Sequence, residues 1–297
     1  MITTMKNFRS ILLVASLFLF PGFVAASSPG EKDPEKKENS AKKKEVKAWR
    51  WEEMYPSDMR KALEEMPVAW VVFSPLEWHG EAMTFGTDPV IGQHVLDKVW
   101  KRVGGVRIPT VYIGSETEFK YLEKGVKSHW GLEVVTKELN HGSIYTRTLT
   151  LQLVLEDYLY FLKREGFKLA IVNSGHGGTE HVQMMREVCE RFSDDNFKAV
   201  FDLYGMATRL SVPEEFEFKG NSGHAGIREF SFLGAVNPDM VDIEKFGVSE
   251  QDRKIGLKQE DRDKIDFEKA KKAIDYLVEG SVEKIQSMVD EMIKSRQ

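Results

Sequence analysis

Residues 168–178 have the sequence KLAIVNSGHGG, in which the apolar residues 169–172 and Asn173 are followed by a glycine-rich turn. Such a short apolar run is typical of a strand that is buried on both faces of a parallel sheet. Similar runs occur at residues 66–73, 106–113 and 198–203. Stretches with helical periodicity separate them, at residues 89–103, at residues 147–165, after the glycine-rich turn through Arg191, and at residues 267–293. The alternation predicts an α/β layered domain with a largely parallel central sheet flanked by helices.

The composition limits the functions that this domain can have. The 297 residues include 42 Lys and Arg against 47 Asp and Glu, a formal charge of −5, so no nucleic-acid partner is expected. The single cysteine, Cys189, cannot form an internal disulfide and suits a small buried residue on a helix. One thiol also excludes a metal site built on several thiolates. Any bound metal must therefore be held by His, Asp and Glu side chains.

The first 48 residues are predicted to lie outside the folded domain. Residues 1–26 carry two basic residues, an apolar stretch at 11–20 and the small-residue pattern Val24-Ala25-Ala26, which together indicate a secretory signal peptide. We therefore expect an exported protein, periplasmic or secreted, with no membrane attachment after cleavage; a retained anchor is the alternative. Residues 27–48 are rich in Lys and Glu and predict a flexible linker. The folded domain is then expected to span residues 49–297.

Residues with metal-ligand chemistry follow three of the predicted strands. They are Glu77, His79 and Asp88 after the first strand, His176 after residues 168–173, and His224 with Glu229 after the fourth strand. In parallel sheets, functional residues collect on loops at the carboxyl ends of strands, so these loops are expected at one edge. Each loop alone also has a structural interpretation. Asp88 suits the N-cap of the next helix, the glycines around His176 suit a plain turn, and Glu229 suits a helix start.

Taken together, these residues resemble the creatininase family of metal-dependent amidohydrolases. The likeness covers about residues 67–236 and rests on three motifs in order. They are Glu-x-His-Gly with Gly-Thr-Asp at Glu77, His79, Gly80, Gly86, Thr87 and Asp88; His-Gly-Gly at His176, Gly177 and Gly178; and His-Ala-Gly-x-x-Glu-x-Ser at His224, Ala225, Gly226, Glu229 and Ser231.

The resemblance implies a creatininase-like fold and a site with two divalent metal ions, Zn, Mn or Fe. It places Glu77 and His176 on one ion, His79 and Glu229 on the other, and Asp88 between them. His224 would transfer a proton. The implied reaction is hydrolysis of a non-peptide C–N bond, in a cyclic or small linear amide, through metal-bound hydroxide. The resemblance also implies a homo-oligomer, such as a hexamer.

Several positions depart from the family pattern and leave the substrate open. Ala82-Met83-Thr84, Thr179 and Phe230 replace the usual residues, and Gly178 stands where some members have a carboxylate ligand. The changes at positions 82, 84, 179 and 230 motivate the alternative of a non-catalytic periplasmic protein that binds a metal or small ligand with the same fold. Hydrolysis of a lactone or a phosphoester on the same metals is a further alternative. Trp78 and Trp130 either wall the pocket or belong to the core. His94 and His181 fall on helix patterns and His129 and His141 in a long loop, so none of the four is expected to be a ligand.

Overall fold

The centre of the protein is a five-stranded sheet with the spatial order β1-β3-β2-β6-β7, in which every neighbouring pair is parallel. The computed structural model describes residues 46–115, 120–122, 125–127, 143–201 and 213–294. The strands of the sheet are β1 Ala48–Arg50, β2 Val68–Val72, β3 Gly105–Arg107, β6 Leu169–Asn173 and β7 Lys198–Phe201. The predicted parallel α/β sheet is therefore confirmed. A separate antiparallel pair joins β4 Lys120–Leu122 to β5 Gly125–Lys127.

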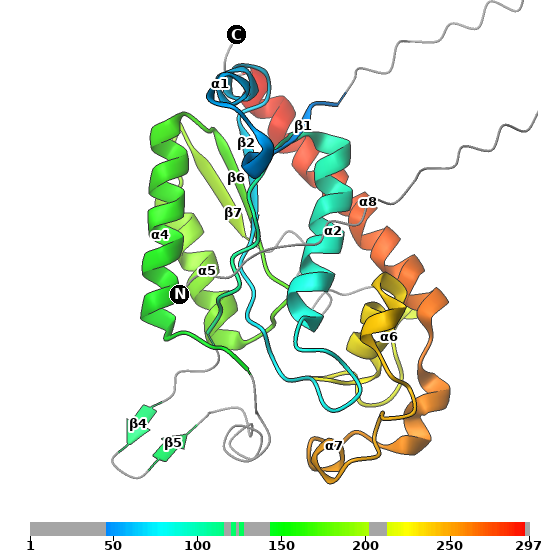
Figure 1. Cartoon of the computed structure of the whole chain (residues 1–297). Helices are drawn as coiled ribbons and strands as arrows, with labels where there is room; N and C mark the ends of the chain where they lie inside the picture. The colour runs from blue at the N-terminus through cyan, green and yellow to red at the C-terminus, as the bar shows by residue number, and fades with distance from the viewer. Residues whose placement is uncertain (1–45, 116–119, 123–124, 128–142, 202–212, 295–297) are drawn as a thin grey trace, which may run out of the picture. The chain divides into compact units, whose positions relative to one another are not determined.

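Helices cover both faces of the sheet, as Figure 1 shows for α4 and α5 on one side and α2 and α8 on the other. The α-helices are α1 Pro56–Glu65, α2 Thr87–Val103, α4 Thr148–Glu165, α5 Thr179–Phe192, α6 Ile227–Val236, α7 Glu250–Lys254 and α8 Phe267–Lys294. Short 3-10 helices are η1 Trp51–Glu53, η2 Glu214–Phe216, η3 Pro238–Met240 and η4 Gln259–Lys264. None of the described helices is both long enough and apolar enough to cross a membrane.

Side-chain alternation along the strands divides the core into two halves. Val68, Trp70 and Val72 of β2 pack with α2, α6 and α8, whereas Ala69 and Val71 pack with α1, α4 and α5. Every residue of β2 is buried, as expected of a central parallel strand with helices on both faces. Cys189 is buried in the second half, as predicted, and burial raises the pKa of its thiol to about 12.

Two element boundaries differ from the sequence-based expectation. The predicted strand at residues 106–113 forms a ladder only over Gly105–Arg107, followed by one isolated parallel bridge between Phe73 and Val111. Pro109 lies in between and has no N–H to donate, which explains the interruption. The first long helix begins at Thr87, with Gly86 at the N-cap, so Asp88 lies in the first helical turn. The interpretation of Asp88 as a helix cap is therefore wrong.

The strand order creates a crevice between β2 and β6. The chain passes from β2 to β3 on one side of β2 and later returns to β6 on the other side. At such a switch point the loops that leave neighbouring strands diverge, and the space between their carboxyl ends accepts ligands. The loops after β2 and β6 are those that carry Glu77, His79 and His176. The fold thus brings two of the three motif loops to one crevice.

The predicted signal peptide, residues 1–26, lies outside the described residues, as does the predicted linker up to residue 45. The linker was expected to end at residue 48, but Ala48 is already the first residue of β1. Residues 202 and 203, the end of the predicted fourth strand, also lie outside the described part of the chain.

Glycine allows the loop after β6 to touch the first turn of α2. A Cβ atom on Gly175 would lie 1.8 Å from the carbonyl oxygen of Asp88, and one on Gly92 would lie 2.9 Å from the amide nitrogen of Gly175. The Asn173 side chain also donates a hydrogen bond to the carbonyl oxygen of Gly92 (3.3 Å). This close backbone approach holds Asp88 beside the loop that carries His176.

We predict that Gly175→Ala destabilises the metal-free protein by about 1–3 kcal/mol, because the added methyl group forces the loop away from α2. Gly223→Ala is the matched control, since its Cβ would meet only the Asn221 Oδ1 atom, at 3.5 Å. Urea unfolding of both variants measures the free energy difference. Equal stabilities for the two variants would contradict the proposed close packing.

Candidate metal centre

Six side chains from three separated loops converge at the carboxyl end of the sheet. Five of these residues, Glu77, His79, Asp88, His176 and Glu229, are buried, each with at most 8% of its surface exposed. His224 is more open, with 24% of its side chain exposed. Glu77 and His79 lie on the loop after β2, and His176 lies on the loop after β6. Asp88 and Glu229 lie in the first turns of α2 and α6. The structure brings together every predicted site residue.

His176 contacts two of the three carboxylates. Its Nδ1 atom lies 2.8 Å from Glu77 Oε2 and 3.2 Å from Asp88 Oδ2. One ligand atom from each of these three residues falls within 4.8 Å of the others, close enough to share one metal ion. This group contains the two predicted ligands of the first ion and the predicted bridging residue.

Asp88 also reaches the second histidine. Its Oδ1 atom lies 3.1 Å from His79 Nε2, so the two oxygens of one carboxylate face two different imidazoles. Glu229 Oε2 lies 3.6 Å from the same His79 nitrogen and accepts a hydrogen bond from the Ala225 amide (2.6 Å). This is the arrangement expected of a bridging carboxylate with a separate carboxylate on the His79 side. How the ligands divide between two ions stays a prediction.

His224 lies on the open side of the cluster. Its Nδ1 atom is 3.7 Å from Glu77 Oε1, and its ring centroid is 4.5 Å from that of His79. One atom each of Glu77, His79 and His224 also falls within 4.8 Å of the others, so His224 could ligate an ion instead of transferring a proton.

Backbone carbonyl groups fix which nitrogen of each histidine carries the proton. His79 Nδ1 lies 3.1 Å from the Glu77 carbonyl oxygen, His176 Nε2 lies 3.2 Å from that of Ser115, and His224 Nε2 lies 2.8 Å from that of Trp78. A carbonyl oxygen only accepts, so each of these nitrogens is the donor. The opposite nitrogen of each ring faces the carboxylates. Neutral His79 and His176 therefore offer a lone pair toward the cluster, as metal ligands must.

The buried charges shift the pKa values in opposite directions. Burial alone would lower the pKa of His79, but Asp88, Glu229 and Glu77 raise it to about 10. The pKa of His176 is raised well above its usual value, because Glu77 and Asp88 outweigh the effect of burial. Burial would raise the pKa of Glu77, yet the charges of His176 and His224 hold it well below the ordinary value. Without a metal ion, protons on the two histidines offset the carboxylate charges.

The donor set fits a divalent metal. Carboxylate oxygens and imidazole nitrogens together suit Zn²⁺, Mn²⁺ or Fe²⁺. A cation would replace the protons that the two raised pKa values place on His79 and His176. The residues that the chain supplies are thus chemically matched to the metal ions that the resemblance implies.

Two residues near the cluster were missed by sequence reasoning. The Tyr145 hydroxyl donates a hydrogen bond to Glu77 Oε1 (2.7 Å), although 68 residues separate the two. His181, expected only to follow a helix pattern, is completely buried, and its ring stands edge-on to His176 at 5.0 Å. Burial and the nearby charge of His176 hold the pKa of His181 well below its usual value. No short motif marks either residue, and only the tertiary contacts show them.

The family-atypical positions do not all face the site. Phe230 is fully buried and packs against Phe246 and Phe267, with ring centroids 5.1 and 6.3 Å away, so it belongs to the core. Trp78 is also buried, and its amide donates to the Ser143 hydroxyl (2.7 Å). Trp130, His129 and His141 lie outside the described residues.

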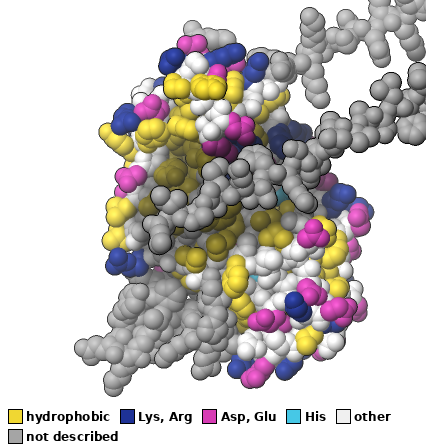
Figure 2. Space-filling model, viewed as in Figure 1, with side chains coloured by type: hydrophobic (Ala, Val, Ile, Leu, Met, Phe, Trp, Pro, Cys, Tyr) yellow, Lys and Arg dark blue, Asp and Glu magenta, His cyan; other side chains and the backbone are white. Residues whose placement is uncertain are grey.

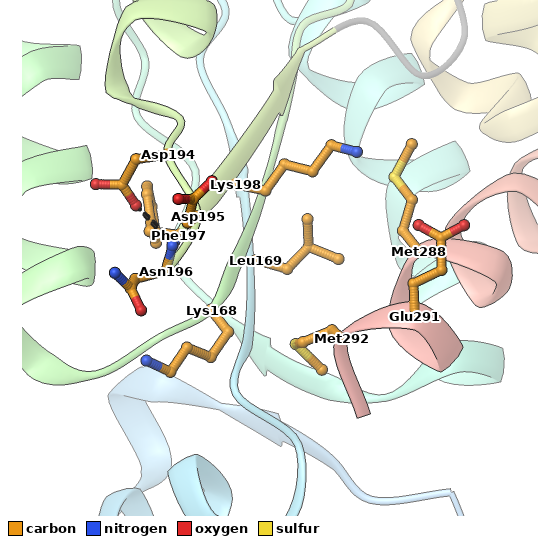
Figure 3. A pocket seen from close by; sticks show the side chains of 10 residues that line it. All are labelled: Lys168, Leu169, Asp194, Asp195, Asn196, Phe197, Lys198, Met288, Glu291 and Met292. Atoms are coloured by element: carbon orange, nitrogen blue, oxygen red, sulfur yellow. Dashed lines mark hydrogen bonds between the residues drawn. The ribbon is translucent and has the colours of Figure 1, made fainter. Parts of the chain in front are cut away.

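A hollow of about 410 Å³ lies elsewhere, at the amino ends of β6 and β7 (Figure 3). Lys168 and Leu169 line it from the start of β6, Lys198 from the start of β7, and Met288 with Glu291 from α8. None of the six site residues is among the described residues that line this hollow. The hollow lies at the amino ends of the strands, whereas the candidate site lies at their carboxyl ends.

Comparisons with known proteins find several similar structures. A search of solved structures finds a creatinine amidohydrolase (creatininase) at 18% identity, covering 82% of this chain and 99% of that one, with a TM-score of 0.61. A structure named creatininase Mn gives the same values. A putative creatinine amidohydrolase from Bacteroides fragilis matches at 19% identity, covering 84% of this chain and 96% of that one, with a TM-score of 0.54. These likenesses show the fold.

No match was found among curated protein sequences. The family model described as creatinine amidohydrolase matches residues 52–293, which contain all six site residues. The family and the fold support a metal-dependent amidohydrolase. This chain belongs to the creatininase family.

Proposed function

We propose that the protein hydrolyses a non-peptide C–N bond in a small cyclic or linear amide, with the aid of two divalent metal ions. The observation that carries the proposal is the position of Asp88, whose two carboxylate oxygens face His79 and His176 at 3.1 and 3.2 Å. A carboxylate shared by two imidazoles, with one further carboxylate on each side, is a ligand set for two ions rather than one.

In this proposal Glu77 and His176 hold one ion, His79 and Glu229 hold the other, and Asp88 bridges them. Zn, Mn or Fe would satisfy these donors, and two similar structures are named as Mn and Zn–Zn forms of creatininase. Bound metal ions lower the pKa of water and polarise a carbonyl group. The protein's own part is to fix the ligand atoms. The backbone carbonyls that cap His79 and His176 turn one nitrogen of each ring toward the carboxylates.

His224 would supply the proton transfer, and the reacting atom would be Nδ1. Its Nε2 atom is committed to the Trp78 carbonyl oxygen (2.8 Å), whereas Nδ1 faces the cluster. Hydrolysis adds the oxygen of water to the carbonyl carbon and breaks the C–N bond. His224 Nδ1 can take one proton from that water and pass it to the leaving nitrogen, so the ring ends the reaction as it began. The partial exposure of His224 supports the role, because a substrate must reach this side chain.

Tyr145 assists by holding Glu77. Its hydroxyl donates to Glu77 Oε1, which leaves Oε2 facing His176.

A non-catalytic protein that binds a metal or a small ligand is the second candidate. The atypical residues Met83, Thr84 and Thr179, on the loop after β2 and at the start of α5, favour it. Measured turnover would exclude it.

We further propose that the chain forms a homo-oligomer. Hydrophobic side chains reach the surface in several places (Figure 2), and three of them are spaced along one side of α4. Leu149, Leu153 and Tyr160 are each more than half exposed, at a spacing of four and then seven residues. Light scattering of the purified protein is expected to give a multiple of the monomer mass. A monomer at micromolar concentration would contradict this proposal.

Metal content and turnover test the roles of the site residues. We expect the metal-loaded wild-type protein to bind two ions and to hydrolyse at least one member of a panel of small amides that includes creatinine. Asp88→Ala is expected to lose both ions because it removes the shared ligand. His224→Ala should keep both ions and lose turnover by about 100-fold or more.

Mass spectrometry of the metals and circular dichroism of each variant separate ligand loss from misfolding. Equal loss of metal from Asp88→Ala and His224→Ala would contradict the assigned roles. A folded wild-type protein that binds no divalent metal would overturn the proposed function.

The raised histidine pKa values predict how pH affects stability. In the metal-free folded protein, the second ring proton of His79 has a pKa of about 10, whereas in the unfolded chain its pKa is near 6.5. The resulting stabilisation is complete below pH 6.5 and is lost as pH rises toward 10. We therefore expect the free energy of unfolding to fall between pH 6.5 and 9, by up to about 1.4 kcal/mol per pH unit for each such proton.

The metal-loaded protein is the control, because its metal-bound histidines carry no such proton. Its stability should change less over the same range, and metal binding near pH 7 should release protons. Urea unfolding at several pH values and calorimetry in buffers of different ionisation enthalpy measure the two effects. A metal-free protein whose stability rises over this range would refute the charge balance.

A further inference from the structure

We propose that His181 is a positioning residue that fixes His176 toward the metal ion held by Glu77, Asp88 and His176. This inference rests on the proposed function, since it assumes that His176 is a ligand. His181 makes no contact with a carboxylate of the cluster among the described hydrogen bonds. It acts instead through Ser115 and Ser174, the two residues that hold His176 in place.

The hydrogen bonds of His181 determine its tautomer. The Ser115 amide donates to His181 Nδ1 (3.3 Å), so Nδ1 must be the acceptor. The proton of the neutral ring is therefore on Nε2, which donates to the Ser174 hydroxyl oxygen (3.0 Å). The neutral imidazole thus joins the loop after β3, which contains Ser115, to the loop after β6. A side chain without both an acceptor and a donor could not make this connection.

Each of the two serines holds a different part of His176. The Ser174 hydroxyl accepts a hydrogen bond from the His176 amide (3.0 Å) and thereby fixes the backbone of His176. The Ser115 carbonyl accepts from His176 Nε2 (3.2 Å) and fixes the ring. The Ser115 backbone therefore lies between the two imidazoles, with its N–H on His181 and its C=O on His176. His181 therefore positions the carbonyl that keeps His176 Nδ1 turned toward Glu77 and Asp88, with which it would hold the metal ion.

The His79 side of the cluster does not use this network. The Nδ1 atom of His79 is capped by the Glu77 carbonyl oxygen, on a different loop. Loss of His181 should therefore weaken the binding of only one of the two metal ions. Outer hydrogen-bond partners of metal ligands commonly change metal affinity by about 10–100-fold. A purely space-filling role for His181 predicts a different result, namely lower stability with no preference between the two ions.

The experiment titrates the full metal-free protein with Co²⁺ and follows both calorimetry and the visible absorption of the bound ion. We expect His181→Phe to weaken one of the two binding steps by about 10–100-fold, to change the absorption of that ion, and to leave the other step unchanged. His181→Gln, which keeps one donor and one acceptor, should restore part of the lost affinity. His94→Phe is the matched control, because His94 lies on α2 and is not part of this network.

Ser174→Ala provides a second test if His181→Phe does not fold. It removes the hydroxyl between His181 and the His176 amide, and it should weaken the same single step. The inference is overturned if both steps keep wild-type affinity in the variants that fold, or if both weaken equally together with the unfolding temperature. A wild-type protein that binds no metal refutes the proposed function and this inference. If the wild-type protein binds two ions and the variants bind them with unchanged affinity, only the role of His181 is refuted.

Discussion

The contact of one buried carboxylate, Asp88, with two buried imidazoles is the interaction on which the rest of the site depends. It requires α2 to begin at Thr87, so that Asp88 lies where the amide groups of the first turn favour a negative charge. It also requires Gly175, because a side chain there would collide with the Asp88 backbone. Charges buried in this way are costly unless they are balanced, and a divalent ion on each side of Asp88 would balance them.

The parallel sheet makes this arrangement possible. The strands β2 and β6 are neighbours, yet the chain leaves them in opposite directions across the sheet, so their loops open a crevice. The loop after β2 supplies the backbone carbonyl groups that cap His79 and His224, and Ser115, after β3, supplies the one that caps His176. The fold therefore fixes both the positions of the side chains and the nitrogen that each imidazole presents.

Much of the fold followed from local sequence patterns, because buried strands and amphipathic helices have distinct periodicities. The strand at residues 168–173 and the helix at residues 267–293 agree with β6 and α8 to within one residue. The predicted strand over residues 106–113 was too long because Pro109 interrupts the ladder. His181, Tyr145 and Phe230 could not be interpreted from sequence, since their roles depend on contacts with elements far along the chain. A histidine on a helix pattern has the same local signature whether it fills space or holds a metal ligand.

A crystal structure of the metal-loaded protein, with anomalous diffraction recorded at the absorption edge of the bound metal, tests the central claim most directly. We expect two anomalous peaks on either side of the Asp88 carboxylate, one next to His176 and one next to His79. A single peak that excludes Asp88, or a folded and metal-saturated protein with no peak at this cluster, would contradict the two-metal site.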